Sequence, residues 1–422
     1  MPETKSNTFT PYKKFIIVIL AIVQFTVILD FMVLSPLGAI LLKELSISAA
    51  QFSLVVSAYA FSAGAAVLLA AGFADKFDRK KLLLFFYVGF IFGTLLCGMA
   101  PNYHFLLIAR VVTGVFGGVM SSISYAIITD LFAIQFRGRV MGFVQMAFAS
   151  SQVIGIPLGL FLANMFNWHA PFQMIVGVSI VVAASIFFYM KPIDEHLKLQ
   201  KQGNAFQHLT AIFSNTNYLK AFGATTLLAS GGFMLMPFGS AYGVHNLGID
   251  IEQLPYLYMA TGVCMLVASP MIGKLSDKIG KYKMFIIGSV ITSIMTLIYC
   301  NLAVTPLWII IILNVLLFVG ITGRMISASA LMTAVPEAQD RGAFMGVNAS
   351  IQQIAGGMAS IVAGLIVKET ASGYLNNYGI LGNVVIVAVI LTTFLMYTLN
   401  KYVQDKQAQS TVTPAGSANE AV

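Results

Sequence analysis

The chain has 422 residues, of which 58% are hydrophobic and 9% are charged, and its formal net charge is +8. A soluble protein of this length needs far more charged residues on its surface, so the composition excludes a soluble globular class. All three cysteines, Cys97, Cys264 and Cys300, fall inside apolar runs. They therefore indicate neither a disulfide framework nor a thiolate metal site.

Apolar runs of roughly 20 residues follow one another along the chain, and each is long enough to cross a hydrocarbon core about 30 Å thick. There are twelve of them, at residues 14–38, 51–74, 82–100, 104–129, 140–163, 171–190, 218–240, 253–273, 284–304, 307–332, 342–367 and 379–400. The sequence therefore predicts an all-α integral membrane protein with twelve transmembrane helices.

Two loops of this chain repeat at half its length. Asp75 lies in the segment A-G-F-A-D-K-F-D-R-K, and Asp277, 202 residues later, lies in G-K-L-S-D-K-I-G-K-Y-K. A second pair recurs at 204 residues, because Arg137 and Arg341 each begin the pattern Arg-Gly-x-x-Met-Gly. Such self-similarity indicates two halves with one architecture, and in a membrane protein it is typical of transporters built from parallel repeats.

The repeat predicts two six-helix bundles, formed by residues 1–190 and 218–400. Residues 191–217 are the longest polar interruption, and we interpret them as a cytoplasmic linker, part of which suits an amphipathic helix on the membrane surface. Residues 401–422 end in a segment rich in Gln, Ser, Thr, Ala and Gly. We expect this segment to be a disordered cytoplasmic tail.

The placement of the basic residues predicts the orientation in the membrane. With the N-terminus in the cytoplasm, the cytoplasmic segments hold 20 of the 24 Lys and Arg residues, and the outer loops hold only Lys43 and Lys368. This bias predicts a multi-pass protein of the bacterial inner (plasma) membrane with both termini cytoplasmic. The net charge then reflects membrane insertion and does not indicate nucleic-acid binding.

The repeated loops have residue types that suit a gate. A small residue at the end of a span lets a neighbouring helix approach, and an aspartate at the start of the next helix can accept hydrogen bonds from its free N–H groups. Basic residues behind it can pair with acids of the opposite half. The alternative is that the loops serve only topology and solvation. The candidate gating residues are Asp75, Arg79, Arg137, Gly273, Asp277, Lys278, Gly280 and Arg341.

The loop pair resembles the signature of the major facilitator superfamily, which is Gly, two residues, a small residue, Asp, a basic residue, any residue, Gly and further basic residues. The full pattern runs from Gly273 through Asp277 to Gly280, whereas Ala71 and Asp78 replace the two glycines in the first copy. The resemblance extends over all twelve spans. It implies the major facilitator fold and secondary active transport by alternating access.

Three further motifs point to one branch of that family. Span four carries Arg110-x-x-x-Gly114, similar to the family's pattern in that helix, and span one carries an acidic motif around Asp30 similar to that of drug exporters. Span five reads Gly155-Ile156-Pro157-Leu158-Gly159, which resembles the Gly-x-Pro-x-Gly helix of drug:proton antiporters and arabinose-efflux-type permeases. The residues Gly155, Pro157 and Gly159 are expected to bend that helix and to let it pack closely.

One carboxylate lies well inside an apolar run. Asp30 is about eight residues before the outer end of span one, and Arg110 is about six residues inside span four from the same side. By resemblance, spans one, four, seven and ten line the central cavity, which would let the two side chains meet. We predict that Asp30 exchanges the coupling proton with Arg110 as its partner. The alternatives are a static ion pair and direct contact of Asp30 with a cationic substrate.

Arg324 is a second cation within an apolar run, and it lies in span ten. One interpretation is a binding group for an anionic or zwitterionic substrate. The other is an arginine that snorkels to the inner surface or bonds backbone carbonyls.

Aromatic, methionine and amide side chains of the spans are candidates for the substrate site, because they suit a pliable, partly polar cavity. They are Phe31, Tyr59, Tyr125, Gln145, Phe233, Met236, Phe238, Asn314, Asn348 and Gln352. Packing against lipid or another helix is the alternative for each aromatic residue, and hydrogen bonding between helices is the alternative for each amide.

These features predict a secondary transporter that exports small amphipathic molecules, either drugs or sugar-like compounds, in exchange for protons. The alternatives are a proton-coupled importer of an anionic or polar nutrient and a non-transporting membrane sensor. We expect a monomer in the lipid bilayer whose partners are the small-molecule substrate and protons. We expect no enzymatic activity, cofactor, metal site or nucleic-acid partner.

Overall fold

The computed structural model describes residues 9–71, 76–194, 197, 212–337, 340–370 and 372–412. Within these residues, twelve helical segments are long and apolar enough to cross a membrane: Pro11–Val33, Ala49–Ala70, Arg79–Cys97, Tyr103–Leu131, Arg139–Met165, Ala170–Tyr189, Thr216–His245, Ile251–Ile279, Lys281–Tyr299, Leu307–Ala334, Ala343–Ile366 and Tyr378–Lys406. The predicted all-α class with twelve spans in two six-helix bundles is confirmed.

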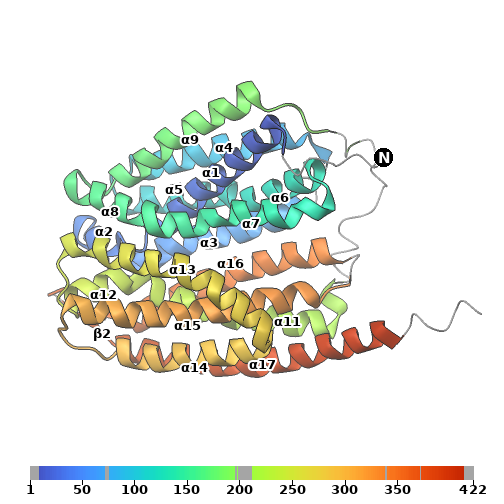
Figure 1. Cartoon of the computed structure of the whole chain (residues 1–422). Coiled ribbons are helices and arrows are strands. Elements are labelled where there is room, and N and C mark those ends of the chain that lie inside the picture. The colour runs from blue at the N-terminus through green and yellow to red at the C-terminus, as the bar shows by residue number, and fades with distance from the viewer. Residues whose placement is uncertain are drawn as a thin grey trace, which may run out of the picture. The chain divides into compact units, whose positions relative to one another are not determined.

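Nine α-helices are described up to the end of span six, because span four is broken into α5 and α6, span five is broken into α7 and α8, and the short helix α2 lies between spans one and two. They are α1 (Pro11–Val33), α2 (Gly38–Glu44), α3 (Ala49–Ala71), α4 (Arg79–Cys97), α5 (Tyr103–Gly117), α6 (Met120–Leu131), α7 (Ile134–Ser150), α8 (Ile156–Met165) and α9 (Ala170–Tyr189). The later spans contain α11 (Thr216–Leu235), α12 (Gly239–His245), α13 (Leu254–Ile279), α14 (Lys281–Tyr299), α15 (Leu307–Ala334), α16 (Arg341–Ile366) and α17 (Tyr378–Val412). Figure 1 shows these helices in chain order.

The chain divides into two compact units. Unit 1 contains residues 1–47, 58–203 and 251–259, and unit 2 contains residues 48–57, 204–250 and 260–422. Most of spans one to six therefore belongs to unit 1, and most of spans seven to twelve to unit 2. The narrower limits of the predicted bundles, at residues 190 and 218, stay a prediction.

The break in span five follows from its sequence. Residues Ser151–Gly155 form a π-helical turn between α7 and α8, immediately before Pro157. Proline has no N–H to donate to the preceding turn, so a wider turn is a common way to accommodate it. A Cβ on Gly155 would lie 2.6 Å from Leu29 of α1, so glycine allows the turn to pack against that helix. Gly159 packs in the same way, with Val33 2.9 Å from its Cβ position.

In each unit one closely packed helix pair positions a buried arginine, Arg110 in unit 1 and Arg324 in unit 2. In unit 1, α4 packs along α5, and a Cβ on Gly93 would lie 2.7 Å from the Thr113 backbone nitrogen. In unit 2, α14 packs along α15, and a Cβ on Gly288 would lie 2.8 Å from the Gly320 carbonyl oxygen. The pair α14 and α15 lies side by side in Figure 1. Glycine at both contacts lets the backbones approach as small residues do in membrane proteins generally.

Two segments differ from the prediction. Helix α17 continues to Val412, so the expected disordered tail is wrong for residues 401–412. Residues 401–412 contain three Gln, two Lys and one Ala, which favour helix. Lys406 anchors the extension by donating to the carbonyl oxygens of Val335 and Pro336, both at 3.2 Å. The sequence also did not reveal a two-stranded antiparallel hairpin, β1 (Lys368–Glu369) with β2 (Leu375–Asn376), between α16 and α17. Most of the predicted linker and residues 413–422 lie outside the described residues.

Candidate functional site

A fully buried ion pair joins α1 to α5 in unit 1. Nη1 of Arg110 lies 2.8 Å from Oδ2 of Asp30, and both side chains have no exposed surface. The same Nη1 also donates to the Asp30 carbonyl oxygen at 3.4 Å. The two residues predicted to meet therefore do meet. Asp30 is three residues before the end of α1 at Val33, so it is closer to the helix end than the sequence indicated.

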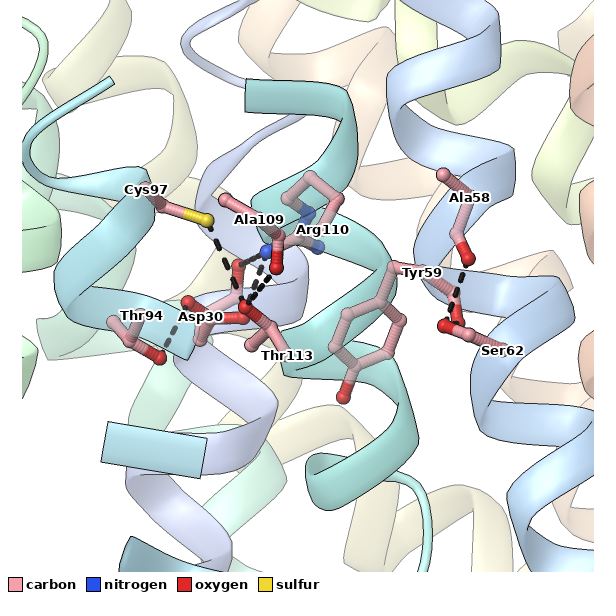
Figure 2. A network of polar contacts seen from close by, with 9 residues as sticks. All are labelled: Asp30, Ala58, Tyr59, Ser62, Thr94, Cys97, Ala109, Arg110 and Thr113. Atoms are coloured by element: carbon pink, nitrogen blue, oxygen red, sulfur yellow. Dashed lines mark hydrogen bonds and ion pairs between the residues drawn. The ribbon is translucent and has the colours of Figure 1, made fainter. Parts of the chain in front are cut away.

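Thr94, Tyr59 and Phe31 complete the surroundings of this pair, and Figure 2 shows the first two of them beside Asp30 and Arg110. Thr94 of α4 donates to Asp30 Oδ1 at 3.2 Å, which satisfies the second carboxylate oxygen. The Arg110 guanidinium lies over the Tyr59 ring, with its central carbon 4.6 Å from the ring centroid, in a cation–π contact. Phe31 packs against Tyr59, with ring centroids 5.1 Å apart. Nε and Nη2 of Arg110 have no hydrogen-bond acceptor among the residues that the structure describes.

Small residues on α4 and α5 explain why Asp30, Thr94 and Arg110 converge. The Gly93–Thr113 contact brings α4 and α5 together immediately beside Thr94. On the neighbouring face, a Cβ on Gly114 would lie 2.5 Å from the Tyr59 carbonyl oxygen, so only glycine lets α3 approach Arg110 this closely. The Arg-x-x-x-Gly spacing therefore places the cation and the close contact on one face of α5, one turn apart.

Arg324 of α15 is the buried cation of unit 2, with 3% of its surface exposed. Its guanidinium lies 5.5 Å from the centroid of the Phe285 ring of α14. Nη1 points toward α11, where it would lie 3.9 Å from a Cβ on Gly231. Within the described part of the chain, Nε and Nη2 have no hydrogen-bond partner and the side chain forms no ion pair. The snorkelling interpretation does not fit a side chain that is almost completely buried.

The predicted cavity residues differ in their burial and in the contacts that they make. Asn348 accepts a hydrogen bond from Thr225 at 2.6 Å, and Asn314 accepts one from Thr261 at 3.1 Å. Phe233 packs onto Gly356 of α16, with ring atoms 2.7 Å from the Cβ position. Phe238 is fully buried, Tyr125, Met236 and Gln352 are half-buried, and Gln145 is exposed on α7. Helix-to-helix contact is therefore the observed role of both asparagines, and substrate contact stays a prediction for all of these residues.

The first gating loop is described only after its aspartate. Asp75 lies outside the described residues, and the residue that caps α4 is Asp78, whose Oδ1 accepts from the backbone N–H groups of Lys80 at 2.7 Å and Lys81 at 3.2 Å. Arg79, the first residue of α4, is 6% exposed and donates to Asp130 of α6 at 3.0 Å. The departure of Asp78 from the family glycine is thus an N-cap that fixes the start of α4.

The second gating loop corrects the expected position of its aspartate. Asp277 lies in the last turn of α13 and pairs with Lys281, so it does not cap α14. Gly280 is the residue at that helix start, and it has φ +99°, a backbone conformation that favours glycine. This turn leaves Asp277 on the preceding helix. Gly273 lies inside α13 with open space at its Cβ position, and Lys278 is exposed.

The side-chain contacts of Arg137 are described, whereas those of Arg341, the other candidate gating arginine outside these loops, are not. Arg137 donates to the carbonyl oxygens of Phe132 at 2.9 Å and Thr129 at 2.7 Å, and so satisfies free carbonyl groups at the end of α6. Arg341 begins α16, and its side chain lies outside the described residues. The gating role of the whole set stays a prediction.

Two residues of these sites escaped the sequence reasoning. Thr94 completes the hydrogen bonds of Asp30, and Phe285 lies beside Arg324. A depth comparison was the available signal for Thr94, because it is three residues from the outer end of α4 just as Asp30 is three residues from the end of α1. Nothing in the sequence distinguishes Phe285 from the other phenylalanines of the spans.

The similarity to known proteins agrees with this architecture. The model of the Major Facilitator Superfamily matches residues 20–245 and 221–418, which together cover nearly the whole chain. The chain belongs to the Major Facilitator Superfamily. Proteins of this superfamily are transporters.

Two relatives are similar to this superfamily member over most of their length. The bicyclomycin resistance protein homolog of Haemophilus influenzae is 25% identical over 362 residues, which cover 84% of this chain and 89% of that protein. The putative transporter AraJ of Escherichia coli is 23% identical over 368 residues, which cover 85% of this chain and 88% of that protein. These relatives agree with the branch that the motifs of spans one, four and five resemble.

Solved structures share the fold of this transporter. A bacterial homolog of the human lysosomal transporter Spinster superposes with a TM-score of 0.74 over 93% of this chain and 98% of that chain. The sequence identity is 13%, so this likeness concerns the fold and not the substrate.

Proposed function

We propose that this transporter exports small amphipathic molecules from a bacterial cytoplasm in exchange for protons, and that Asp30 carries the coupling proton. The observation that carries the proposal is the fully buried Asp30–Arg110 pair, with its 2.8 Å contact between Nη1 and Oδ2. Among the described residues, Asp30 is the one buried acid. A carboxylate in such a position is costly in a membrane protein and marks a functional site by default.

The geometry suggests how protonation is coupled to movement. While Asp30 is ionised, its charge holds Arg110, and α1 and α5 are tied together through one short contact. Protonation removes the charge of Asp30 and most of that attraction, while Thr94 and the Tyr59 ring still surround the two side chains. The tie between α1 and α5 then weakens. The proton would thus bias the transporter between two arrangements of these helices, as alternating access requires.

Export, and not import, is supported by resemblance. The Gly-x-Pro-x-Gly sequence produces a π-helical turn in span five, and the similar bicyclomycin resistance protein homolog bears the name of a resistance protein. Two cytoplasmic termini, and with them the bacterial inner membrane, are proposed from the distribution of Lys and Arg. The predicted importer differs in one respect that can be measured, because substrate and protons would then move in the same direction.

A transport assay tests this proposal. The full chain is reconstituted into liposomes that contain a pH-sensitive dye, and drugs, sugars and organic anions are added in turn. We expect at least one compound to trigger proton movement opposite to its own movement in the wild type. Asp30→Asn should abolish this proton movement and still bind the compound. Asp250→Asn, an exposed Asp→Asn control in unit 2, should behave as the wild type.

Three results would contradict the proposal. Full proton-coupled transport by Asp30→Asn would exclude Asp30 as the proton carrier. Movement of compound and protons in the same direction would exclude export and favour the importer. Binding of a compound without any net movement would instead indicate a sensor.

A further inference from the structure

The charged side chains buried in the described part of the chain do not balance. They are Asp30, Arg79, Arg110 and Arg324. Asp30 pairs with Arg110 and Arg79 pairs with Asp130, but Arg324 forms no ion pair with any carboxylate among the described residues. An isolated charge inside a membrane protein is unfavourable, and such residues usually pair with each other or face a ligand path. One positive charge in unit 2 is therefore without an internal counter-ion.

The described residues around Arg324 pack against its guanidinium but accept few of its hydrogen bonds and do not neutralise its charge. One side faces the Phe285 ring, which is fully buried. Nη1 faces Gly231 of α11, and Val385 of α17 lies 3.9 Å from the same Cβ position. Thr292 of α14 packs at Gly320, one turn before Arg324, and in the described part of the chain its hydroxyl also has no hydrogen-bond partner. Apolar groups and unused hydrogen-bond donors thus meet in one place.

The depth of Arg324 in the membrane distinguishes a lipid headgroup from a water-soluble molecule as the source of an anion. Arg324 is ten residues before the end of α15 at Ala334, which is roughly 15 Å along the helix. Helical side chains tilt toward the N-terminus of their helix, so Arg324 leans away from that end. A lipid headgroup at the membrane surface would have to sink by this distance to reach the guanidinium. A water-soluble amphiphile that enters the bundle has no such restriction.

The size of the unbalanced charge indicates the kind of anion. A carboxylate carries one negative charge and matches the planar guanidinium with two parallel hydrogen bonds. A phosphate monoester carries about −1.5 to −2 near neutral pH and would leave excess negative charge in an apolar site. A single carboxylate therefore fits the charge of Arg324 better than a phosphate does.

We propose that Arg324 anchors the carboxylate of an amphipathic organic acid, with the apolar part of the acid against the side chains around Gly231. This inference names the substrate class of the transport function proposed above and takes its biological meaning from it. Glycine at position 231 is part of the site, because it leaves the space beside Nη1 free of a side chain. Phe285 acts as a positioning residue that holds the guanidinium plane.

Binding of matched acids and amides tests the proposal without transport. The purified full chain is placed in nanodiscs of uncharged phosphatidylcholine, and the affinities for benzoate, 2-naphthoate and decanoate are compared with those for the three corresponding amides. We expect the wild type to bind at least one acid about 10- to 100-fold more tightly than its amide, the size expected for hydrogen bonds to a charged group. Arg324→Met should remove that preference, and Arg324→Lys should retain part of it.

Variants of glycine provide a matched pair. Gly231→Leu keeps the charge and fills the space beside Nη1, so the acid preference should fall. Gly223→Ala, two turns earlier on α11, should keep it, because the Cβ would make only an ordinary 3.6 Å contact with Leu395. Competition between phosphatidylglycerol added to the nanodiscs and the acid would overturn the choice of a soluble carboxylate and indicate a lipid headgroup.

The remaining outcomes separate this proposal from the transport function. If the wild type does not prefer any acid over its amide, or if Arg324→Met keeps the preference, the anion site is wrong. Asp30→Asn should keep the preference, since it leaves unit 2 unchanged. Acid binding without acid-triggered proton movement would contradict the proposed coupling while supporting the site. If Arg324→Met still transports uncharged compounds with protons as the wild type does, that result would support the proposed coupling. The anion site would then be decided by the comparison of acid and amide binding alone.

Discussion

Arg110 and Arg324 are buried guanidinium groups in long apolar helices, and the contrast between them separates two roles of a charge inside the bundle. Within the described ranges, Nε and Nη2 of both arginines have no hydrogen-bond acceptor, and both guanidinium groups lie against an aromatic ring. They differ at Nη1. Nη1 of Arg110 forms an ion pair with Asp30 in unit 1, whereas Nη1 of Arg324 faces Gly231 in unit 2. A paired cation can respond to a proton on its partner, whereas an unpaired cation can respond to an anion that arrives from outside.

The largest effect on stability is expected when the paired cation is removed. Arg110→Ala would leave Asp30 buried without its counter-ion, and breaking a buried pair in this way costs about 3–5 kcal/mol. A urea titration of the purified chain in detergent micelles measures the loss. The double variant Asp30→Asn/Arg110→Ala removes both charges and should recover a large part of it. Equal instability of the single and double variants would show that the unpaired carboxylate is not the cause.

The helix contacts beside the two arginines should respond alike, although Arg110 is paired with a carboxylate and Arg324 forms no ion pair within the described residues. Gly93→Ala would place a Cβ 2.7 Å from the backbone nitrogen of Thr113, and Gly288→Ala would place one 2.9 Å from the backbone nitrogen of Arg324. Each overpacked contact should destabilise the protein by about 1–3 kcal/mol. Gly177→Ala is the control, because nothing lies within 4 Å of its Cβ position. Thermal unfolding in micelles measures all three, and a neutral Gly288→Ala beside a harmful Gly93→Ala would disprove the similarity of the two contacts.

Removal of the unpaired cation should cost much less than removal of the paired one. Arg324→Met replaces a desolvated charge by an apolar side chain of similar length and leaves no carboxylate behind. We expect a loss of at most about 1 kcal/mol, or a gain in stability. The same urea titration checks this. A loss as large as that of Arg110→Ala would mean that Arg324 has an internal stabilising role and does not await a ligand.

The smallest effect concerns the exposed ion pair of the second gating loop. Lys281 pairs with Asp277 one turn earlier, and 72% of the Asp277 side chain is exposed. Lys281→Ala should change the stability by only a few tenths of a kcal/mol, since exposed pairs four residues apart contribute about 0.3–0.5 kcal/mol. Arg79→Ala in the first loop should cost more, because Arg79 is 6% exposed and bonded to Asp130. Equal effects in the two loops would contradict this difference in burial.

The sequence predicted the class, the spans and the central ion pair for physical reasons. Apolar length determines which segments can cross the membrane, and the similar depths of Asp30 on span one and Arg110 on span four predicted that the two side chains meet. The lack of a partner for Arg324 could also be anticipated, because Asp30 is the one acid deep in the apolar runs.

Details that depend on contacts between helices were not predictable in the same way. The hydrogen bond of Thr94 to Asp30 requires the rotation of α4 about its axis, which hydrophobic periodicity does not determine in an all-apolar span. The aspartate expected to cap α14 remains on α13, because Gly280 turns the chain after it. The end of α17 depends on the anchoring of Lys406 at the end of α15, a contact between distant residues.

The role of Asp30 as the proton carrier is tested most sharply by substrate-triggered proton movement in liposomes that contain the wild type, Asp30→Asn or Arg324→Met. We expect Asp30→Asn to bind the substrate and to move no protons. We also expect Arg324→Met to need more of an acidic substrate and still to move protons with each molecule transported. Normal proton movement by Asp30→Asn would contradict the account, because the buried Asp30–Arg110 pair would then be a static tie between α1 and α5.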